Sequence, residues 1–95
     1  MHTFLIDTHT HLDFDRYDAD REHVIERAKD SDVAAMLTIG IDYKTSLAAV
    51  EIARQHTNIF ASVGVHPHDA KELTEEQMQE LTELLNHPRV VAIGE

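Results

Sequence analysis

The chain has 95 residues, which is enough for one small domain with a modest core. Acidic residues outnumber basic ones 18 to 8, and the formal net charge of −10 disfavours binding of nucleic acid through a basic surface, although bound divalent cations would reverse the sign locally. Because the chain has no cysteine, no signal-peptide pattern and no apolar stretch of membrane-spanning length, we expect a cytoplasmic protein without disulfides, thiolate metal sites or membrane contact.

Short apolar runs alternate with segments of helical periodicity along the chain. The first run, residues 4–6, is typical of a buried strand. Thr45 or Ser46 is placed to cap the second helix, and Thr74 opens a capping-box sequence before the third. We expect strands over residues 4–6, 33–39, 59–65 and 90–93, and helices over residues 18–30, from 45 to about 56, and after 74.

The expected order of elements is βαβαβαβ, with strands starting roughly 30 residues apart, as in a parallel α/β protein. Either a doubly wound sheet or a (βα)₈ barrel of the TIM type can begin in this way. Four strands are half a barrel, and the chain stops on a strand without the helix that should cover it. We therefore expect residues 1–95 to form a single incomplete domain.

His9 and His11 follow the first expected strand directly. Side chains two residues apart in extended chain point to the same side, so the two imidazoles can converge on one ion. Imidazole is a common ligand of zinc and of several other divalent metals. The alternative is a pair of partly buried histidines that are satisfied by hydrogen bonds.

Other candidate residues follow the third and fourth strands, where His66, His68 and Glu95 stand. Ligand sites of parallel α/β proteins lie at the carboxyl ends of the strands, so these side chains can meet the first pair. Each also has a simpler interpretation, because Glu95 can be a solvated carboxylate and the His66 ring can pack on Pro67. The other histidines stand at the terminus, in helices or in a loop: His2, His23, His56 and His87.

Two imidazoles and a carboxylate leave open positions on a metal, as a catalytic site requires. If the carboxylate bridges two ions, the pair can activate water and also stabilise the leaving oxygen of a phosphodiester. Nitrogen and oxygen ligands without sulfur fit zinc, manganese or magnesium. The sequence therefore predicts one or two divalent ions of undetermined identity.

Three motifs in this order resemble the TatD-type metal-dependent deoxyribonucleases: residues 6–13 (IDTHTHLD), 64–68 (GVHPH) and 90–95 (VVAIGE). The resemblance implies the N-terminal half of a (βα)₈ barrel that carries a metal site at its mouth. It further implies that His9 and His11 ligate one metal, that Glu95 acts in catalysis by bridging two, and that His66 contacts the substrate phosphate. The implied substrate is DNA, often cut from the 3′ end, with RNA for some members.

The resemblance also implies ligands on later strands that this chain does not contain. We therefore predict that the isolated 95-residue chain is inactive and that its open sheet edges lead it to dimerise or aggregate. Two other enzyme types remain alternatives, namely hydrolases of the amidohydrolase or phosphotriesterase kind and a polymerase-and-histidinol-phosphatase-like domain. A non-enzymatic metal-binding module that docks on another chain is the alternative from a different class.

Overall fold

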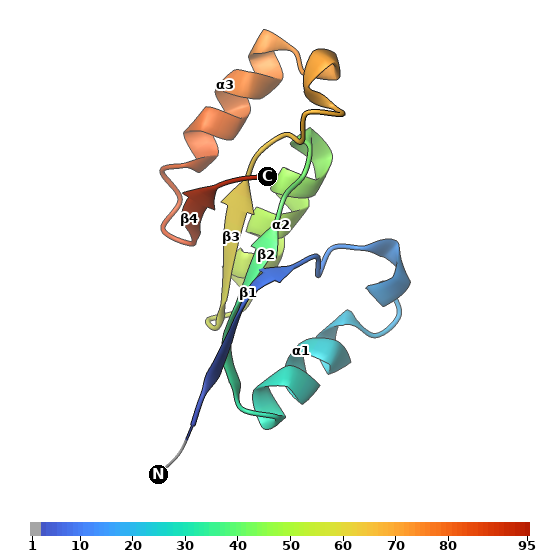
Figure 1. Cartoon of the computed structure of the whole chain (residues 1–95), viewed down its shortest axis with the longest axis vertical. Coiled ribbons are helices and arrows are strands. Elements are labelled where there is room, and N and C mark those ends of the chain that lie inside the picture. The colour runs from blue at the N-terminus through green and yellow to red at the C-terminus, as the bar shows by residue number, and fades with distance from the viewer. Residues whose placement is uncertain (1–2) are drawn as a thin grey trace.

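The computed structural model describes residues 3–95, which alternate between strands and helices (Figure 1). No helix in this range has the length and apolar character needed to cross a lipid bilayer. Two 3₁₀ turns, Asp15–Tyr17 and Ala70–Glu72, precede the first and third helices. The elements are β1 (Leu5–Thr10), α1 (Arg21–Asp30), β2 (Val33–Ile39), α2 (Tyr43–Gln55), β3 (Ile59–Val63), α3 (Glu75–Leu84) and β4 (Val90–Ile93).

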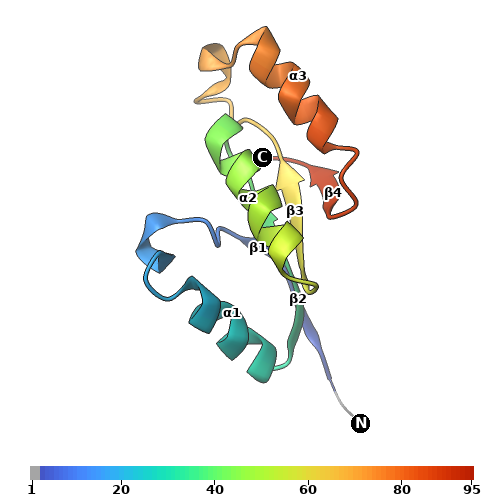
Figure 2. The ribbon, with the colours of Figure 1, turned by 180° about the vertical axis from the view of Figure 1, so that it is seen from behind.

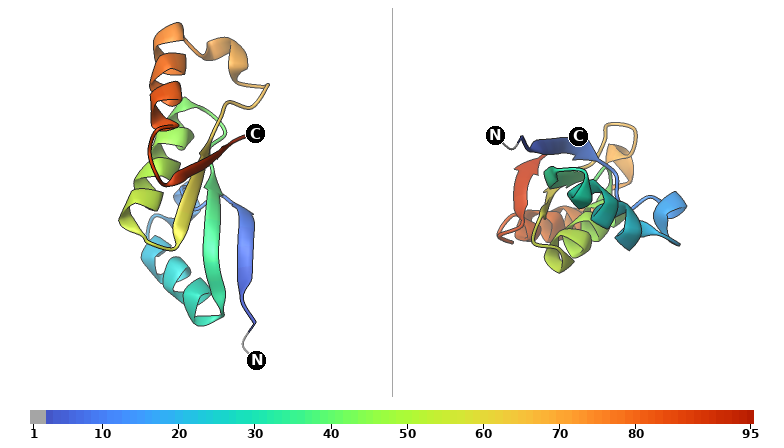
Figure 3. Two further views of the ribbon diagram at one scale, coloured as in Figure 1. Left: turned by 90° about the vertical axis from the view of Figure 1, so that its left-hand side faces the viewer. Right: turned by 90° about the horizontal axis from the view of Figure 1, so that it is seen from below.

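The strands of the described residues form one parallel sheet in the order β1-β2-β3-β4. All three helices lie on the same side of this sheet, as Figure 2 and the left view of Figure 3 show. A doubly wound sheet reverses its strand order and has helices on both faces. The sequential order and single helical layer are those of the N-terminal half of a (βα)₈ barrel, which confirms the fold prediction.

The core lies between the sheet and its helices, with α2 packed against β2 and β3. Ile59 and Ala61 of β3 are fully buried there, and so is Ala49 of α2. Burial of each larger aliphatic side chain contributes about 1.5–3 kcal/mol, so this layer is the main stabilising contact of the chain. The remaining buried members of the cluster are Leu12, Ile25, Met36, Val50, Ile52, Ala53 and Val63.

The prediction that the first strand is buried was wrong. Phe4, Leu5 and Ile6 are 64%, 60% and 66% exposed. The strand is an edge of the sheet, so these side chains have strand neighbours on one side only. At the opposite edge, Val91 and Ile93 of β4 are likewise exposed. Association of the isolated chain through these edges stays a prediction.

The start of α2 also differs from the prediction, because Asp42 is its N-cap instead of Thr45 or Ser46. The Asp42 carboxylate accepts the Thr45 amide hydrogen at 2.8 Å, and the Thr45 hydroxyl accepts the Asp42 amide hydrogen at 2.9 Å. This reciprocal pair is a capping box, and a carboxylate there also complements the helix dipole. Thr74 caps α3 in the same manner with Gln77, as predicted.

Three further boundaries differ by a few residues. The first strand runs to Thr10 instead of residue 6, so His9 lies within the strand and not after it. The first helix begins at Arg21 instead of residue 18, because the chain first makes the 3₁₀ turn at Asp15–Tyr17. The third strand ends at Val63 instead of residue 65. The buried Ser46 hydroxyl donates a hydrogen bond to the Gly64 carbonyl and accepts one from the Gly64 amide, each at 3.1 Å. These backbone groups therefore bond to a side chain instead of to a neighbouring strand.

Candidate metal centre

His9, His11 and Glu95 come together although their strands are the two edges of the sheet. The Glu95 carboxylate lies 3.3 Å from Nε2 of His9 and 3.8 Å from Nε2 of His11. One ligand atom from each residue lies within 4.8 Å of the others. Three strand spacings in a flat sheet amount to about 14 Å, so the curvature of the sheet is what allows this convergence.

The His11 ring is held so that its Nε2 atom can bind a cation. Its Nδ1 atom lies 3.1 Å from the carbonyl oxygen of Ile39, at the end of β2. A carbonyl can only accept, so Nδ1 carries the ring proton and Nε2 keeps its lone pair. The ring also stacks on Phe14, with centroids 4.8 Å apart and planes 9° apart. Metal-binding histidines are commonly oriented by such a backbone contact.

His9 is the more accessible of the two histidines. Its side chain is 54% exposed, against 23% for His11, and the two rings meet edge to face at 5.1 Å. The carboxylate of Asp7 accepts the backbone amide hydrogen of His9 at 3.1 Å. The donor set is therefore two imidazole nitrogens and a carboxylate oxygen with solvent on one side, which fits zinc, manganese or magnesium with positions left open.

Arg21 holds the loop that carries Phe14, and sequence reasoning missed this residue. Its guanidinium donates to the carbonyl oxygens of Leu12, Asp13 and Phe14 at 2.6, 3.3 and 3.1 Å. It also forms an ion pair with Asp18 at 2.8 Å. An arginine three residues after an aspartate is too common in helical segments to reveal such a role.

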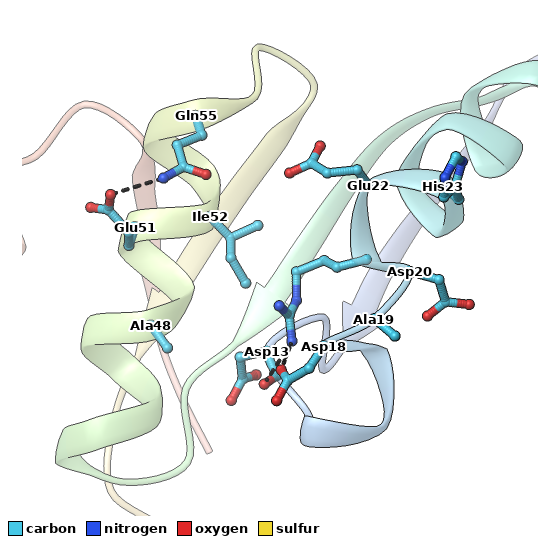
Figure 4. A pocket seen from close by; sticks show the side chains of 11 residues that line it. Asp13, Asp18, Ala19, Asp20, Glu22, His23, Ala48, Glu51, Ile52 and Gln55 are labelled. Carbon is cyan, nitrogen blue, oxygen red and sulfur yellow. Dashed lines mark hydrogen bonds and ion pairs between the residues drawn. The ribbon is translucent and has the colours of Figure 1, made fainter.

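The same loop borders a pocket of about 560 Å³ between α2 and the segment that leads into α1 (Figure 4). Asp13 and Asp18 are among its lining residues. Burial raises the pKa of the Asp13 carboxyl above its usual value, while a backbone hydrogen bond and the neighbouring His11 and Arg21 oppose the rise. The pocket lies beside the His11 loop and is lined by none of the three converging residues.

Replacing Arg21 with lysine is expected to weaken metal binding by about 10-fold, the lower end of the range for groups that orient a ligand. Lysine keeps the charge but cannot donate to three carbonyls from one planar group, so the Phe14 loop and the stacked His11 ring lose their support. Calorimetric titration with Mn²⁺ measures the effect. Arg27→Lys, at an exposed position of the same helix, is the control. Equal affinities for the two variants would contradict the role of Arg21.

His66 stands after β3 and is outside the group of three converging residues found within the described part of the chain. Its backbone amide donates to the carbonyl of Ile41 at 2.7 Å, which ties the loop after β3 to the loop after β2. Its Nδ1 atom accepts the backbone amide hydrogen of His68 at 3.2 Å, and the two rings lie 4.6 Å apart. The structure thus places His66 at the same end of the sheet as Glu95 but outside the group that His9, His11 and Glu95 form.

The remaining histidines have contacts of other kinds. Nε2 of His56 lies 3.3 Å from the Glu22 carboxylate, and Nδ1 of His87 accepts the Arg89 amide hydrogen at 3.1 Å. His23 lines the pocket beside α1. His2 lies outside the described residues.

Comparison with known proteins agrees with the three motifs. A protein family described as TatD related DNase matches residues 6–95. The chain is 45% identical over 91 residues to the "Uncharacterized metal-dependent hydrolase YabD" of Bacillus subtilis, covering 96% of this chain and 36% of that protein. It is 37% identical over 92 residues to the "3'-5' ssDNA/RNA exonuclease TatD" of Erwinia amylovora, with the same coverage of 96% and 36%.

A third relative is the "Uncharacterized metal-dependent hydrolase TatD" of Mycobacterium tuberculosis, which is 38% identical over 93 residues. The alignment covers 96% of this chain and 35% of that relative, so the chain spans about a third of the length of these three proteins. The match confirms the resemblance inferred from the motifs. Since the family match extends from residue 6 to residue 95, the chain belongs to the TatD related DNase family.

Proposed function

We propose that the complete protein is a metal-dependent hydrolase of phosphodiesters that removes nucleotides from the 3′ end of single-stranded DNA, with RNA as a second substrate. The observation that carries the proposal is the convergence of two imidazoles and a carboxylate within 4.8 Å at the carboxyl end of the sheet. Relatives named as 3'-5' ssDNA/RNA exonucleases support the choice of substrate. Residues 1–95 are proposed as part of one catalytic domain, which further strands would complete.

The three converging residues are proposed as metal ligands. His9 and His11 would hold one divalent ion through Nε2, and Glu95 would lie between that ion and a second one. Bound divalent ions supply Lewis-acid stabilisation of the charge on a phosphodiester and lower the pKa of water. They would also offset the negative charge of the chain, which by itself repels a phosphate backbone.

The other proposed roles concern the chain's own side chains. The Ile39 carbonyl keeps the proton of His11 on Nδ1, and Phe14 fixes the ring plane, so that the ligand atom needs little reorganisation. His66, in the loop that follows β3, is proposed to contact the substrate phosphate. Each of these groups lies at the carboxyl end of a strand or in the loop that follows, where catalytic groups of such barrels gather.

The test uses the complete protein and single-stranded DNA labelled at its 5′ end. We expect stepwise shortening from the 3′ end, loss of turnover after removal of metal with a chelator, and recovery with Mn²⁺, Mg²⁺ or Zn²⁺. Blunt duplex DNA and RNA of the same sequence serve as comparison substrates. Cleavage of an amide or lactone in preference to DNA, or full activity without metal, would contradict the proposal.

A further inference from the structure

Ser46 lies near the start of α2 and is fully buried, although its side chain is polar. Its hydroxyl accepts the Gly64 amide hydrogen and donates to the Gly64 carbonyl oxygen, each at 3.1 Å. A buried hydroxyl needs hydrogen-bond partners, and a helical serine can find one in the carbonyl of the preceding turn. Here both bonds go to one residue of another segment, so they link α2 to the chain that follows β3.

Gly64 passes this link on to the segment that carries Glu95. A Cβ atom on Gly64 would stand 2.6 Å from the carbonyl carbon of Gly94 and 3.3 Å from the Glu95 nitrogen, so no side chain fits between the two backbones. The Gly94 amide also donates to the Val63 carbonyl at 3.0 Å. Gly94 is therefore held by a hydrogen bond to Val63 and by contact with Gly64, and the Glu95 backbone starts from this position.

The same serine also touches the residue that follows β2. A Cβ atom on Gly40 would come within 2.6 Å of the Ser46 Cα atom, so the end of this strand lies directly against the helix. The residue before Gly40 is Ile39, whose carbonyl oxygen lies 3.1 Å from Nδ1 of His11 and orients that ring. One buried side chain thus borders the supports of two of the three converging residues.

The position of Ser46 is itself fixed by its helix. The Ser46 amide donates to the Asp42 carbonyl at 2.9 Å, and Asp42 and Thr45 form the capping box at the start of α2. Ala49 and Val50, in the following turn, are buried in the core. A side chain on a capped and packed helix holds its contacts more precisely than one on a loop.

Ser62 provides a contrast on the neighbouring strand. It is also buried, with 2% of its surface exposed, but its hydroxyl has no hydrogen-bond partner among residues 3–95. Loss of the Ser62 hydroxyl therefore breaks no bond that the structure shows. Loss of the Ser46 hydroxyl would leave the amide and the carbonyl of Gly64 without their partner, which is the costly kind of change.

We propose that Ser46 is a positioning residue of the metal centre. By holding Gly64 and bordering Gly40, it sets where the Glu95 carboxylate stands relative to the His11 ring, 3.8 Å apart in the structure. The consequence for metal binding rests on the proposed function of His11 and Glu95 as ligands. The placement of the two strand ends by Ser46 does not depend on a metal.

The first test compares Ser46→Ala with Ser62→Ala in the complete protein, well below the unfolding temperature of each variant. Ser46→Ala should weaken Mn²⁺ binding by about 10-fold in a calorimetric titration, as for other groups that orient a ligand. The Co²⁺ absorption spectrum, which reports ligand geometry, should also change in this variant. Ser62→Ala removes the same hydroxyl at a buried position and should leave both the affinity and the spectrum unchanged.

The second test needs no metal and uses hydrogen exchange of single backbone amides. The Gly94 amide donates to Val63 at the carboxyl end of the sheet, and the Met36 amide donates to Asn58 at 3.0 Å near the other end. In Ser46→Ala, exchange at Gly94 should accelerate by at least about 10-fold more than exchange at Met36, because the opening is local. In Ser62→Ala the two amides should keep their ratio.

The outcomes separate this inference from the proposed function. Equal Mn²⁺ affinity of the two alanine variants would overturn the inference, and so would an equal acceleration of exchange at Gly94 and Met36. Failure of the unaltered protein to bind Mn²⁺ would contradict the proposed function, while the exchange experiment would still decide whether Ser46 holds the strand ends.

A conservative variant covers the case that Ser46→Ala does not fold. Ser46→Cys has a similar shape but a weaker donor and acceptor, so its Mn²⁺ affinity should fall by about 3-fold, between those of serine and alanine. The same affinity as in the unaltered protein would overturn the inference, because the two hydrogen bonds to Gly64 would then not be what positions the centre.

Discussion

Replacing Glu95 with glutamine is expected to lower the affinity of the protein for divalent metal by at least about 100-fold. Loss of a residue that only orients a metal ligand lowers the affinity by up to about 100-fold, and Glu95 is expected to be a ligand itself. The carboxylate is the only anionic member of the three converging residues, and it lies within 3.8 Å of both imidazole Nε2 atoms. Glutamine has nearly the same shape but no charge, and its amide would point hydrogens toward atoms that should face a cation. Calorimetric titration with Mn²⁺ and Zn²⁺ measures the affinity.

Phosphodiester hydrolysis by the complete protein should fall together with metal binding. Glu83→Gln is the matched control, since it makes the same change of charge at an exposed position of α3. That variant should keep the affinity and the activity of the unaltered protein. If Glu95→Gln bound metal as tightly as the control, Glu95 would be only a solvated carboxylate, the simpler interpretation considered for the sequence.

Gly64→Ala is expected to destabilise the protein by about 3 kcal/mol, at the upper end of the usual cost of overpacking. Its Cβ atom would stand 1.6 Å from the carbonyl oxygen and 2.6 Å from the carbonyl carbon of Gly94. Those are backbone atoms of the neighbouring chain segment, so no side-chain rotation can relieve the overlap. The midpoint of urea unfolding measures the change in the free energy of unfolding.

Gly94→Ala provides the control for this substitution. A Cβ atom at Gly94 meets nothing within 4 Å, and neither glycine has a positive φ angle that an alanine would resist. The control should therefore unfold at the same urea concentration as the unaltered protein. Because the Gly64 overlap pushes on the residue before Glu95, Gly64→Ala should also weaken Mn²⁺ binding, which Gly94→Ala should leave unchanged. Similar stability of the two variants would show that β3 and β4 separate at little cost.

Two of the strands could be predicted closely because each is a continuous run of mostly apolar residues. The strand runs at 33–39 and 90–93 coincide with β2 and β4 of the structure. The first strand was expected over residues 4–6 but extends to Thr10, because the polar residues 7–10 carry no apolar signal. Its environment was also wrong, since an apolar side chain such as Ile6 looks the same at a covered and an open position. The N-cap of α2 was assigned to Thr45 or Ser46 instead of Asp42. Asp42 and Thr45 are the two ends of one capping box, and both residue types are common N-caps, so the sequence alone does not tell which of them begins the helix.

The candidate centre could be predicted from the positions of His9, His11 and Glu95 at strand ends, since parallel strands bring their carboxyl ends to one edge. The groups that orient them could not. Arg21 reaches backbone carbonyls, and carbonyl groups are present at every residue, so no side-chain pattern marks the contact. Arg89 is a similar case at the other end of the sheet, where it bonds the Ile59 carbonyl at 2.7 Å and lies 4.1 Å over the Phe60 ring.

The strand order has a consequence for biosynthesis. Each strand pairs with the one made just before it, so Val33 meets Leu5, Ile59 meets Met36 and Val90 meets Ala61. A nascent chain leaving the ribosome can therefore add one strand and its helix at a time, without waiting for a distant partner. Glu95 is the last of the three converging residues to be translated. The sheet can therefore form before a cation binds His9, His11 and Glu95 and links β1 to the end of β4.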